Sequence, residues 1–213
     1  MEAERIADWP RREAYEFFSR ISDPFYALTF RQDVTELLHF AKERGLSFYY
    51  SMIWVCTRAI NAVPAFRAAI RGGEPVLLPR REPSFTDLKP GAEQFHIVTM
   101  PADEPLEDFV RHAAGKSRAQ TGFINEAEES DALIYFSCLP WVELTSLTNE
   151  RNRADPAFAD DSIPRIAWGK YVWENGRAVL GLSMELNHRL IDGLHVGLFA
   201  EELNRQIRRL TEA

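Results

Sequence analysis

Apolar residues recur at helical spacing in several stretches of the chain, and each stretch has its own start or stop signal. Asp33-Val34-Thr35-Glu36 fits a capping box, and Gly45 is a suitable stop. Pro64 ends a run that is apolar on most faces, as in a helix packed under a sheet. The pattern predicts helices over 34–44, about 47–63, from Pro105 to near Gly122, and from Gly193 to about Leu210.

Other stretches favour strands. Residues 132–137 form a continuous apolar run, which is typical of a strand covered on both faces. Asn175-Gly176 stands between two apolar segments and is the strongest hairpin signal in the chain, so 165–174 should pair with 177–187. Shorter strands are expected over 74–79 and 93–100. Together these elements predict an α/β two-layer sandwich, a mixed β-sheet with helices mainly on one face.

Composition narrows the class of protein. With 213 residues, of which 46% are hydrophobic and 12% aromatic, the chain can bury a full core, and we expect a single domain over 1–213. A net charge of -7 argues against a nucleic-acid surface. The charged N-terminus lacks the apolar region of a signal peptide, and Arg58 interrupts the longest apolar run, so we expect no membrane span and a cytoplasmic protein. Cys56 and Cys138 have no metal-ligand spacing, and no metal is expected.

His188 stands out among the candidate chemical groups. It ends the second strand of the predicted hairpin, four residues before Asp192-Gly193 and the final helix. A histidine fixed at such a junction can act as a general base near neutral pH. The competing interpretation is an ordinary core or surface histidine, which is the commoner case for an isolated one.

Residues 186–199, LNHRLIDGLHVGLF, resemble the HxxxDG signature of the chloramphenicol acetyltransferase family, usually HHxxxDGFHV. Other coenzyme A-dependent acyltransferases share HxxxDG, but the match through His195 and Val196 favours this branch. Further stretches resemble the family in the same order: DWPRRE at 8–13, PAFRAAI at 64–70, FSCLPWV at 136–142 and GKY at 169–171. The resemblance therefore spans nearly the whole chain and implies a chloramphenicol-acetyltransferase-like fold.

The resemblance also implies a reaction and the residues that perform it. His188 would deprotonate an acceptor hydroxyl, most simply one of chloramphenicol, for direct attack on the thioester of acetyl-CoA, and Ser137 would stabilise the oxyanion. Asp192 would pair with Arg11 and support the active-site turn. Trp141, Lys170 and Tyr171 match positions near the coenzyme, and Phe18, Tyr26 and Phe95 match the wall of the acceptor pocket. The resembling enzymes are homotrimers with active sites between subunits, and we expect the same here.

Each of these residues also has a plain structural interpretation. Ser137 could be an ordinary strand-end serine, and the aromatic residues could be core. His195 is expected to pack rather than react, as are His39, His96 and His112.

Several positions depart from the family pattern. Asn187 replaces the first histidine, and Ala167 stands where the resistance enzymes have a threonine near the reacting centre. Pro24 and Ser22 replace types expected in the acceptor pocket. Two alternatives therefore stay open: an acyltransferase on this scaffold with another hydroxyl acceptor, and a non-catalytic member that binds a small ligand.

Overall fold

The helices of the computed structural model, which describes residues 1–6 and 8–212, follow the apolar pattern of the sequence. Three of the four predicted helices, α2, α3 and α5, begin and end within one residue of expectation, and α4 ends three residues before Gly122. The helices are α1 (Arg12–Phe18), α2 (Thr35–Glu43), α3 (Phe48–Ala62), α4 (Leu106–Ala119) and α5 (Gly193–Thr211). Short 3-10 turns, η1, η2 and η3, cover Pro64–Arg67, Glu126–Glu128 and Pro156–Asp160.

The strands form a large mixed sheet and a small antiparallel one. The large sheet has the order β2-β10-β8-β7-β5-β6, with β9 beside β10, and the small sheet has the order β1-β4-β3. Strands β5, β7 and β8 run parallel to one another, and the other pairings are antiparallel. The strands are β1 (Glu4–Arg5), β2 (Phe25–Asp33), β3 (Ala68–Arg71), β4 (Glu74–Leu77), β5 (Glu82–Asp87), β6 (His96–Thr99), β7 (Leu133–Leu139), β8 (Arg165–Gly169), β9 (Val172–Glu174) and β10 (Arg177–Asn187).

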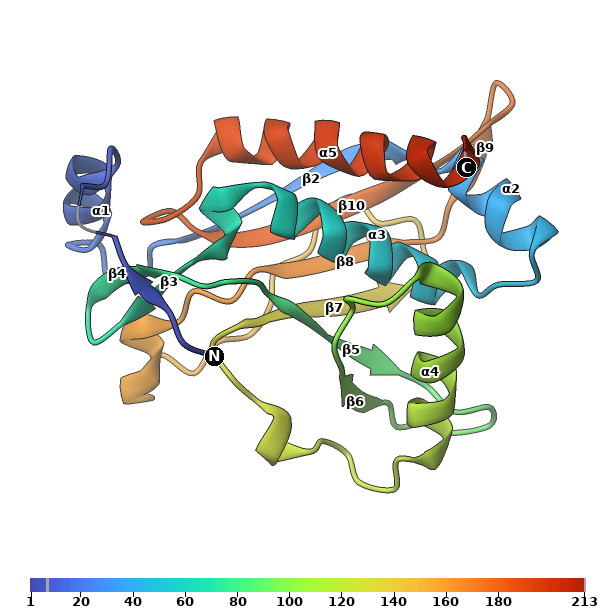
Figure 1. The fold of residues 1–213 in the computed structure, drawn as a ribbon, viewed down its shortest axis with the longest axis horizontal. Helices are drawn as coiled ribbons and strands as arrows, with labels where there is room; N and C mark the ends of the chain where they lie inside the picture. Colours follow the sequence, from blue (N-terminus) through green and yellow to red (C-terminus); the bar gives the residue numbers. More distant parts are fainter. Residues whose placement is uncertain (7, 213) are drawn as a thin grey trace.

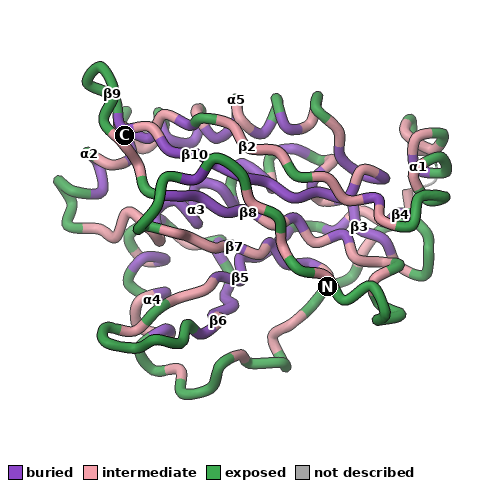
Figure 2. Tube along the Cα trace, turned by 180° about the vertical axis from the view of Figure 1, so that it is seen from behind, coloured by how far each residue is buried: buried purple, intermediate pink, exposed green. Residues whose placement is uncertain are grey.

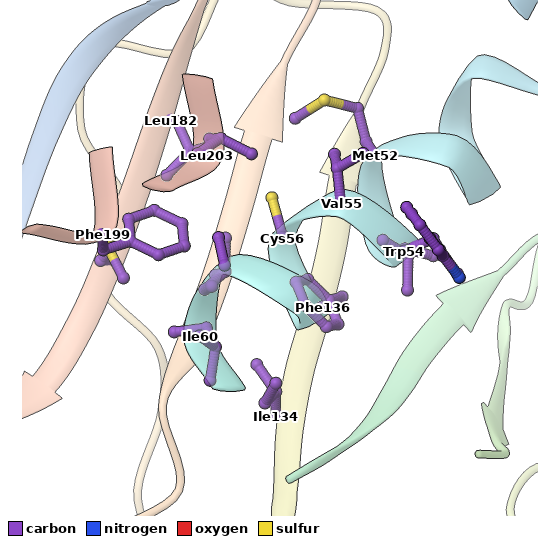
Figure 3. Packing of buried hydrophobic residues seen from close by; sticks show 14 of the residues in the cluster. Met52, Trp54, Val55, Cys56, Ile60, Ile134, Phe136, Leu182, Phe199 and Leu203 are labelled. Carbon is purple, nitrogen blue, oxygen red and sulfur yellow. The ribbon is translucent and has the colours of Figure 1, made fainter. Parts of the chain in front are cut away.

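Helices α3 and α5 lie across one face of the large sheet (Figure 1). Their apolar sides meet the sheet in a core in which Ile60 of α3 lies near Ile134 of β7, while Phe199 and Leu203 of α5 approach Leu182 of β10 (Figure 3). Burial is concentrated in the strands and in α3, whereas α1 and the loops are largely exposed (Figure 2). The expected α/β architecture, with helices mainly on one face, is confirmed.

The Asn175-Gly176 turn is present, with both residues at positive φ (49° and 80°). Residues 165–174 do pair with β10, but in two pieces. Arg177 pairs with Glu174 of β9, and Leu182 pairs with Trp168 of β8. These two pairs are five residues apart on β10 but six residues apart on the partner segment, which therefore contains one additional residue. The additional residue interrupts the strand at Lys170 and Tyr171, which are therefore free to leave the sheet.

Residues 142–151, the covering segment, run over the sheet face opposite to α3 and α5. The segment approaches so closely that a Cβ on Gly181 would overlap the backbone carbonyl of Leu144. Further along β10, Ser183 Oγ donates to Leu147 O (3.3 Å) and Glu185 Oε2 accepts from Asn149 N (2.6 Å). Alternate residues of β10 thus hold this segment against the sheet.

Some predictions of local structure were wrong or incomplete. The capping box at Asp33–Glu36 does not form: Val34 is the N-cap of α2, and Asp33 Oδ1 instead accepts from Thr35 N and Thr35 Oγ1. The sequence analysis also missed α1, β1, β2, β3 and β5. Strand β2 does carry a local signal, the apolar run from Phe25 to Leu28 after Pro24, although most of the strand is only half-buried. No helix among the described residues is long and apolar enough to span a membrane.

Candidate active site

His188 is the first residue after β10, and hydrogen bonds fix the chain on both sides of it. Its backbone N donates to Pro24 O (2.7 Å), which ties it to the residue before β2. Asn187 O accepts from Leu190 N and Ile191 N, both at 3.0 Å, and so closes a tight turn. The turn lies at the same end of the molecule as α1 (Figure 1).

Two aromatic rings hold the His188 imidazole. Phe18 stacks on it with ring centroids 4.0 Å apart and planes 10° apart, and Tyr26 lies at 4.6 Å with a tilt of 41°. His188 is half-buried, and its Nδ1 is buried without a hydrogen-bond partner. The accessible edge of the ring therefore carries Nε2, the nitrogen available to a ligand.

Asp192, four residues after His188, connects the last helix of the chain to the segment before the first helix. It is the N-cap of α5, where its Oδ1 accepts from Leu194 N (3.1 Å), and it forms an ion pair with Arg11 at the start of α1. Burial alone would raise the pKa of Asp192, but the hydrogen bond from Arg11 and nearby positive charge hold that pKa below its usual value. Burial, followed by the charge of Asp192, raises the pKa of Tyr26 to about 12, so the phenol stays protonated.

His195 has a structural contact that its sequence position alone did not indicate. Its Nδ1 accepts from Asp192 N (3.1 Å) and completes a capping box at the start of α5. Burial lowers the pKa of His195, which favours the neutral ring that this acceptor role requires.

Ser137 lies elsewhere, on β7, beside a cavity of about 1020 Å³. Its Oγ accepts from Thr86 Oγ1 (3.3 Å) on the neighbouring strand β5, and Thr86 lines the same cavity. The walls combine aromatic rings, including Phe95 and Trp141, with polar groups, and the covering segment closes one side through residues 147–150. A cavity of this size and lining suits a small aromatic molecule.

Within one chain, His188 and Ser137 are far apart. Ser137, Ala167 and Ser183 form one transverse row across β7, β8 and β10. His188 lies five residues beyond Ser183, about 17 Å along the strand, and two strand spacings to the side, about 10 Å. The two side chains therefore cannot contact the same carbonyl group in one copy of the chain, and His188 does not line the cavity of its own subunit.

The three residues expected near a coenzyme come together. Strands β7 and β8 are parallel and end side by side, with Leu139 opposite Gly169. Just beyond these ends, Lys170 N donates to Val142 O (2.7 Å), which places Lys170 and Tyr171 next to the turn that carries Trp141. Trp141 is 72% exposed, and Lys170 is exposed as well.

Of the residues predicted to line the acceptor pocket, two lie at the His188 turn and one lies in the Ser137 cavity. Phe18 and Tyr26 contact His188, whereas Phe95, which is 46% exposed, lies in the cavity with Ser137. Ala167 is buried directly opposite Ser137. His39, His96 and His112 occupy α2, β6 and α4 and are not among the residues that line the cavity, and across residues 1–6 and 8–212 no cluster of His, Cys, Asp and Glu suits a metal ion.

Sequence reasoning missed two groups near these places. Thr86 contacts Ser137 from β5, a strand that was not predicted. Asn187, noted only as a departure from the family pattern, is 4% exposed and organises the turn after His188. An asparagine side chain can form hydrogen bonds with nearby backbone groups in several ways, and only the folded chain shows which of these bonds Asn187 forms.

Known structures share this fold. A chloramphenicol acetyltransferase superimposes with a TM-score of 0.83 at 23% identity, covering 97% of this chain and 100% of the other. A probable dihydrolipoamide acetyltransferase from Listeria monocytogenes superimposes with a TM-score of 0.66 at 14% identity, covering 97% and 95%. At these identities the likeness establishes an acetyltransferase type of fold and nothing finer.

The sequence comparisons go further. The model of the chloramphenicol acetyltransferase family matches residues 2–204, so the chain belongs to that family. It is 27% identical to chloramphenicol acetyltransferase 3 of Escherichia coli over 202 residues, which are 93% of this chain and 92% of the other. It is 28% identical to the chloramphenicol acetyltransferase of Streptomyces acrimycini over 200 residues, 92% and 89%. The chain is thus an enzyme of the acyltransferase type.

Proposed function

We propose that this enzyme transfers an acetyl group from acetyl-CoA to a hydroxyl of a small aromatic acceptor, with chloramphenicol as the first candidate. The observation that carries the proposal is the His188 ring: Phe18 and Tyr26 pack against it, and its Nδ1 is buried, which leaves Nε2 as the nitrogen for the acceptor. A ring held in this way is preorganised for proton transfer at one nitrogen.

In the proposed reaction, His188 Nε2 takes the proton of the acceptor hydroxyl as its oxygen attacks the thioester carbonyl carbon. The negative charge that develops on the carbonyl oxygen is stabilised by a hydrogen bond from Ser137 Oγ, which Thr86 helps to orient. When the tetrahedral intermediate collapses, the carbon–sulfur bond breaks and the departing thiolate receives the proton from the His188 imidazolium. Atoms and charge balance without an acyl-enzyme.

The separation of His188 from Ser137 within one chain supports an active site shared between subunits. Strand geometry keeps the two residues about 20 Å apart, so a second copy must supply one of them. In a closed homotrimer, each contact between subunits would pair His188 of one copy with Ser137 and the cavity of the next. Phe18 and Tyr26 would then border the acceptor from the side of the base, and Phe95 from the side of the cavity.

The coenzyme is proposed to lie along the carboxyl ends of β7 and β8. Trp141 offers an exposed ring, Lys170 an exposed ammonium group that can meet a phosphate, and Tyr171 a partly buried ring supported by Phe48 at 5.9 Å. All three follow the carboxyl end of β7, which carries Ser137, or of its neighbour β8. An extended thioester could therefore reach from them into the cavity.

Ala167 bears on which hydroxyl compound is the acceptor. The small methyl group of Ala167 stands opposite Ser137 and offers no hydroxyl to hold a water molecule near the reacting centre. This observation favours, as the second candidate, the same chemistry on a different hydroxyl acceptor. Thiol release from acetyl-CoA with chloramphenicol and with a panel of hydroxylated compounds separates the two.

Subunit complementation tests the shared site. His188→Ala and Ser137→Ala chains should each be nearly inactive alone, but assembled together in equal amounts they should restore activity at about a quarter of the subunit contacts. A matched mixture of His188→Ala with wild-type chains serves as the reference. Failure of the mixture to exceed its components, or a fully active monomer, would contradict the proposal.

A further inference from the structure

A buried set of charged side chains lies beside the His188 turn and has no part in the reaction described above. Arg151, the last residue of the covering segment, has a side chain only 4% exposed. Its Nε donates to Glu185 Oε1 of β10 (2.7 Å), and its Nη1 forms an ion pair with Asp161. Glu185 is itself only 6% exposed, so this is a desolvated bridge rather than a surface pair.

The bridge continues to the residue before His188. Asn187 Nδ2 donates to Asp161 O (2.8 Å), and Asn187 Oδ1 accepts from Arg189 N and Arg189 Nε at 3.0 and 3.1 Å. The backbone on both sides of His188 is therefore connected to Asp161, and through Asp161 to Arg151.

Arg151 also contacts β2, the strand that pairs with this end of β10. Its guanidinium carbon lies 3.4 Å from the centroid of the Phe25 ring, and Phe25 pairs with Asn187 in the β2–β10 ladder. One side chain thus contacts both strands at the end from which the His188 turn leaves. Because a guanidinium is planar and rigid, it fixes angles as well as distances between its partners.

We infer that Arg151 is a positioning residue for the base: through Glu185, Asp161 and Asn187 it holds the end of β10 so that His188 meets the acceptor at a reactive distance. The inference rests on the proposed role of His188. Stability alone explains the bridge poorly, because buried ion pairs contribute little net stability compared with apolar packing, whereas they do fix geometry. Arg151 Nη2 is moreover buried without a partner, so the arginine is retained despite one unsatisfied donor.

The test compares Arg151→Met, which keeps the unbranched stem of the side chain and removes the charged guanidinium, with Arg151→Lys, which keeps the charge and loses the planar fork. Misplacement of a reacting group by about 1 Å can cost about a hundredfold in rate. Arg151→Met is therefore expected to lower kcat by about tenfold to a hundredfold per folded molecule while changing the KM for acetyl-CoA by less than about twofold. Arg151→Lys should recover part of the loss.

Arg80→Met is the matched control. Arg80 also binds two carboxylates, those of Glu82 and Asp103 (3.1 Å to Oδ2), but before β5, where it lines a different pocket from Arg151 and Asp161. It should lower stability with kcat per folded molecule unchanged. Circular dichroism, recorded well below the unfolding transition of each variant, gives the folded fraction.

A second readout does not depend on catalysis. The ring resonances of His188, assigned by their loss in His188→Gln, should shift or broaden in Arg151→Met, with the exposed His39 and His112 as internal references. If the wild-type enzyme transfers no acetyl group, the proposed function fails, and the resonances alone decide the inference. An unchanged kcat in an active enzyme, or unchanged His188 resonances, overturns the positioning role of Arg151.

Discussion

The two parts of the candidate active site are built in opposite ways. The His188 turn is closed: a stacked ring, a buried bridge and the Arg11–Asp192 pair surround it. The surroundings of Ser137 are open, a cavity of about 1020 Å³ with exposed aromatic walls. This difference fits the proposed roles, in which a base is fixed before substrates arrive and the cavity admits them. Fixing a group that must transfer a proton removes the cost of orienting it during the reaction.

The closed part should be the more sensitive to loss of its central group. His188→Ala removes the proposed base and is expected to lower kcat by about 10²- to 10⁴-fold. Calorimetry should still detect the acceptor in the Ser137 cavity, because that half of the site is untouched. Residual activity within tenfold of wild type would mean that another group accepts the proton.

In the open part, Ser137→Ala removes the proposed donor to the oxyanion and should lower kcat by about a hundredfold, with little change in KM. Thr86→Val, which removes the hydroxyl that contacts Ser137, should have a smaller effect of the same kind. Steady-state kinetics of both variants against acetyl-CoA and acceptor provide the measurement. An equal effect of the two substitutions would argue that they act on the cavity shape rather than on the oxyanion.

The cavity also depends on the close approach of the covering segment to β10. Gly181→Ala places a methyl group against the Leu144 carbonyl and should cost about 1–3 kcal/mol of unfolding free energy. Gly197→Ala in α5, where nothing lies within 4 Å, is the control and should gain about 0.5–1 kcal/mol from helix propensity. Urea unfolding of the two variants distinguishes a packing effect from loss of a glycine as such.

The smallest effect is expected at the partly exposed ion pair between Arg11 and Asp192. Asp192→Asn should cost about 0.5–1 kcal/mol at neutral pH. Because the folded-state pKa of Asp192 lies below its ordinary value, the pair stabilises fully above about pH 4 and its contribution is lost as the pH falls through the folded pKa. Urea midpoints of the wild-type protein and the variant should therefore converge in acid, and a constant difference would exclude the charge as the cause.

Much of the helical layer and the β9–β10 hairpin could be predicted from the sequence, because their signals are local. A proline stop after α3 and an Asn-Gly turn before β10 act on the few residues around them. Strand β2 has only a short local signal, the apolar run from Phe25 to Leu28. Its partner and register are set by the ladder with β10, more than 140 positions later in the chain.

The sequence by itself determined the family, the acetyltransferase type of fold and which histidine and serine to examine, because motif residues keep their order and spacing in the chain. Only the tertiary structure decided how far apart His188 and Ser137 lie, that Phe18 stacks on the base, and that Arg151 reaches the end of β10. These contacts join residues separated by tens to hundreds of positions. No local pattern of residues encodes them, since they arise when strands distant in sequence pair and bury their side chains together.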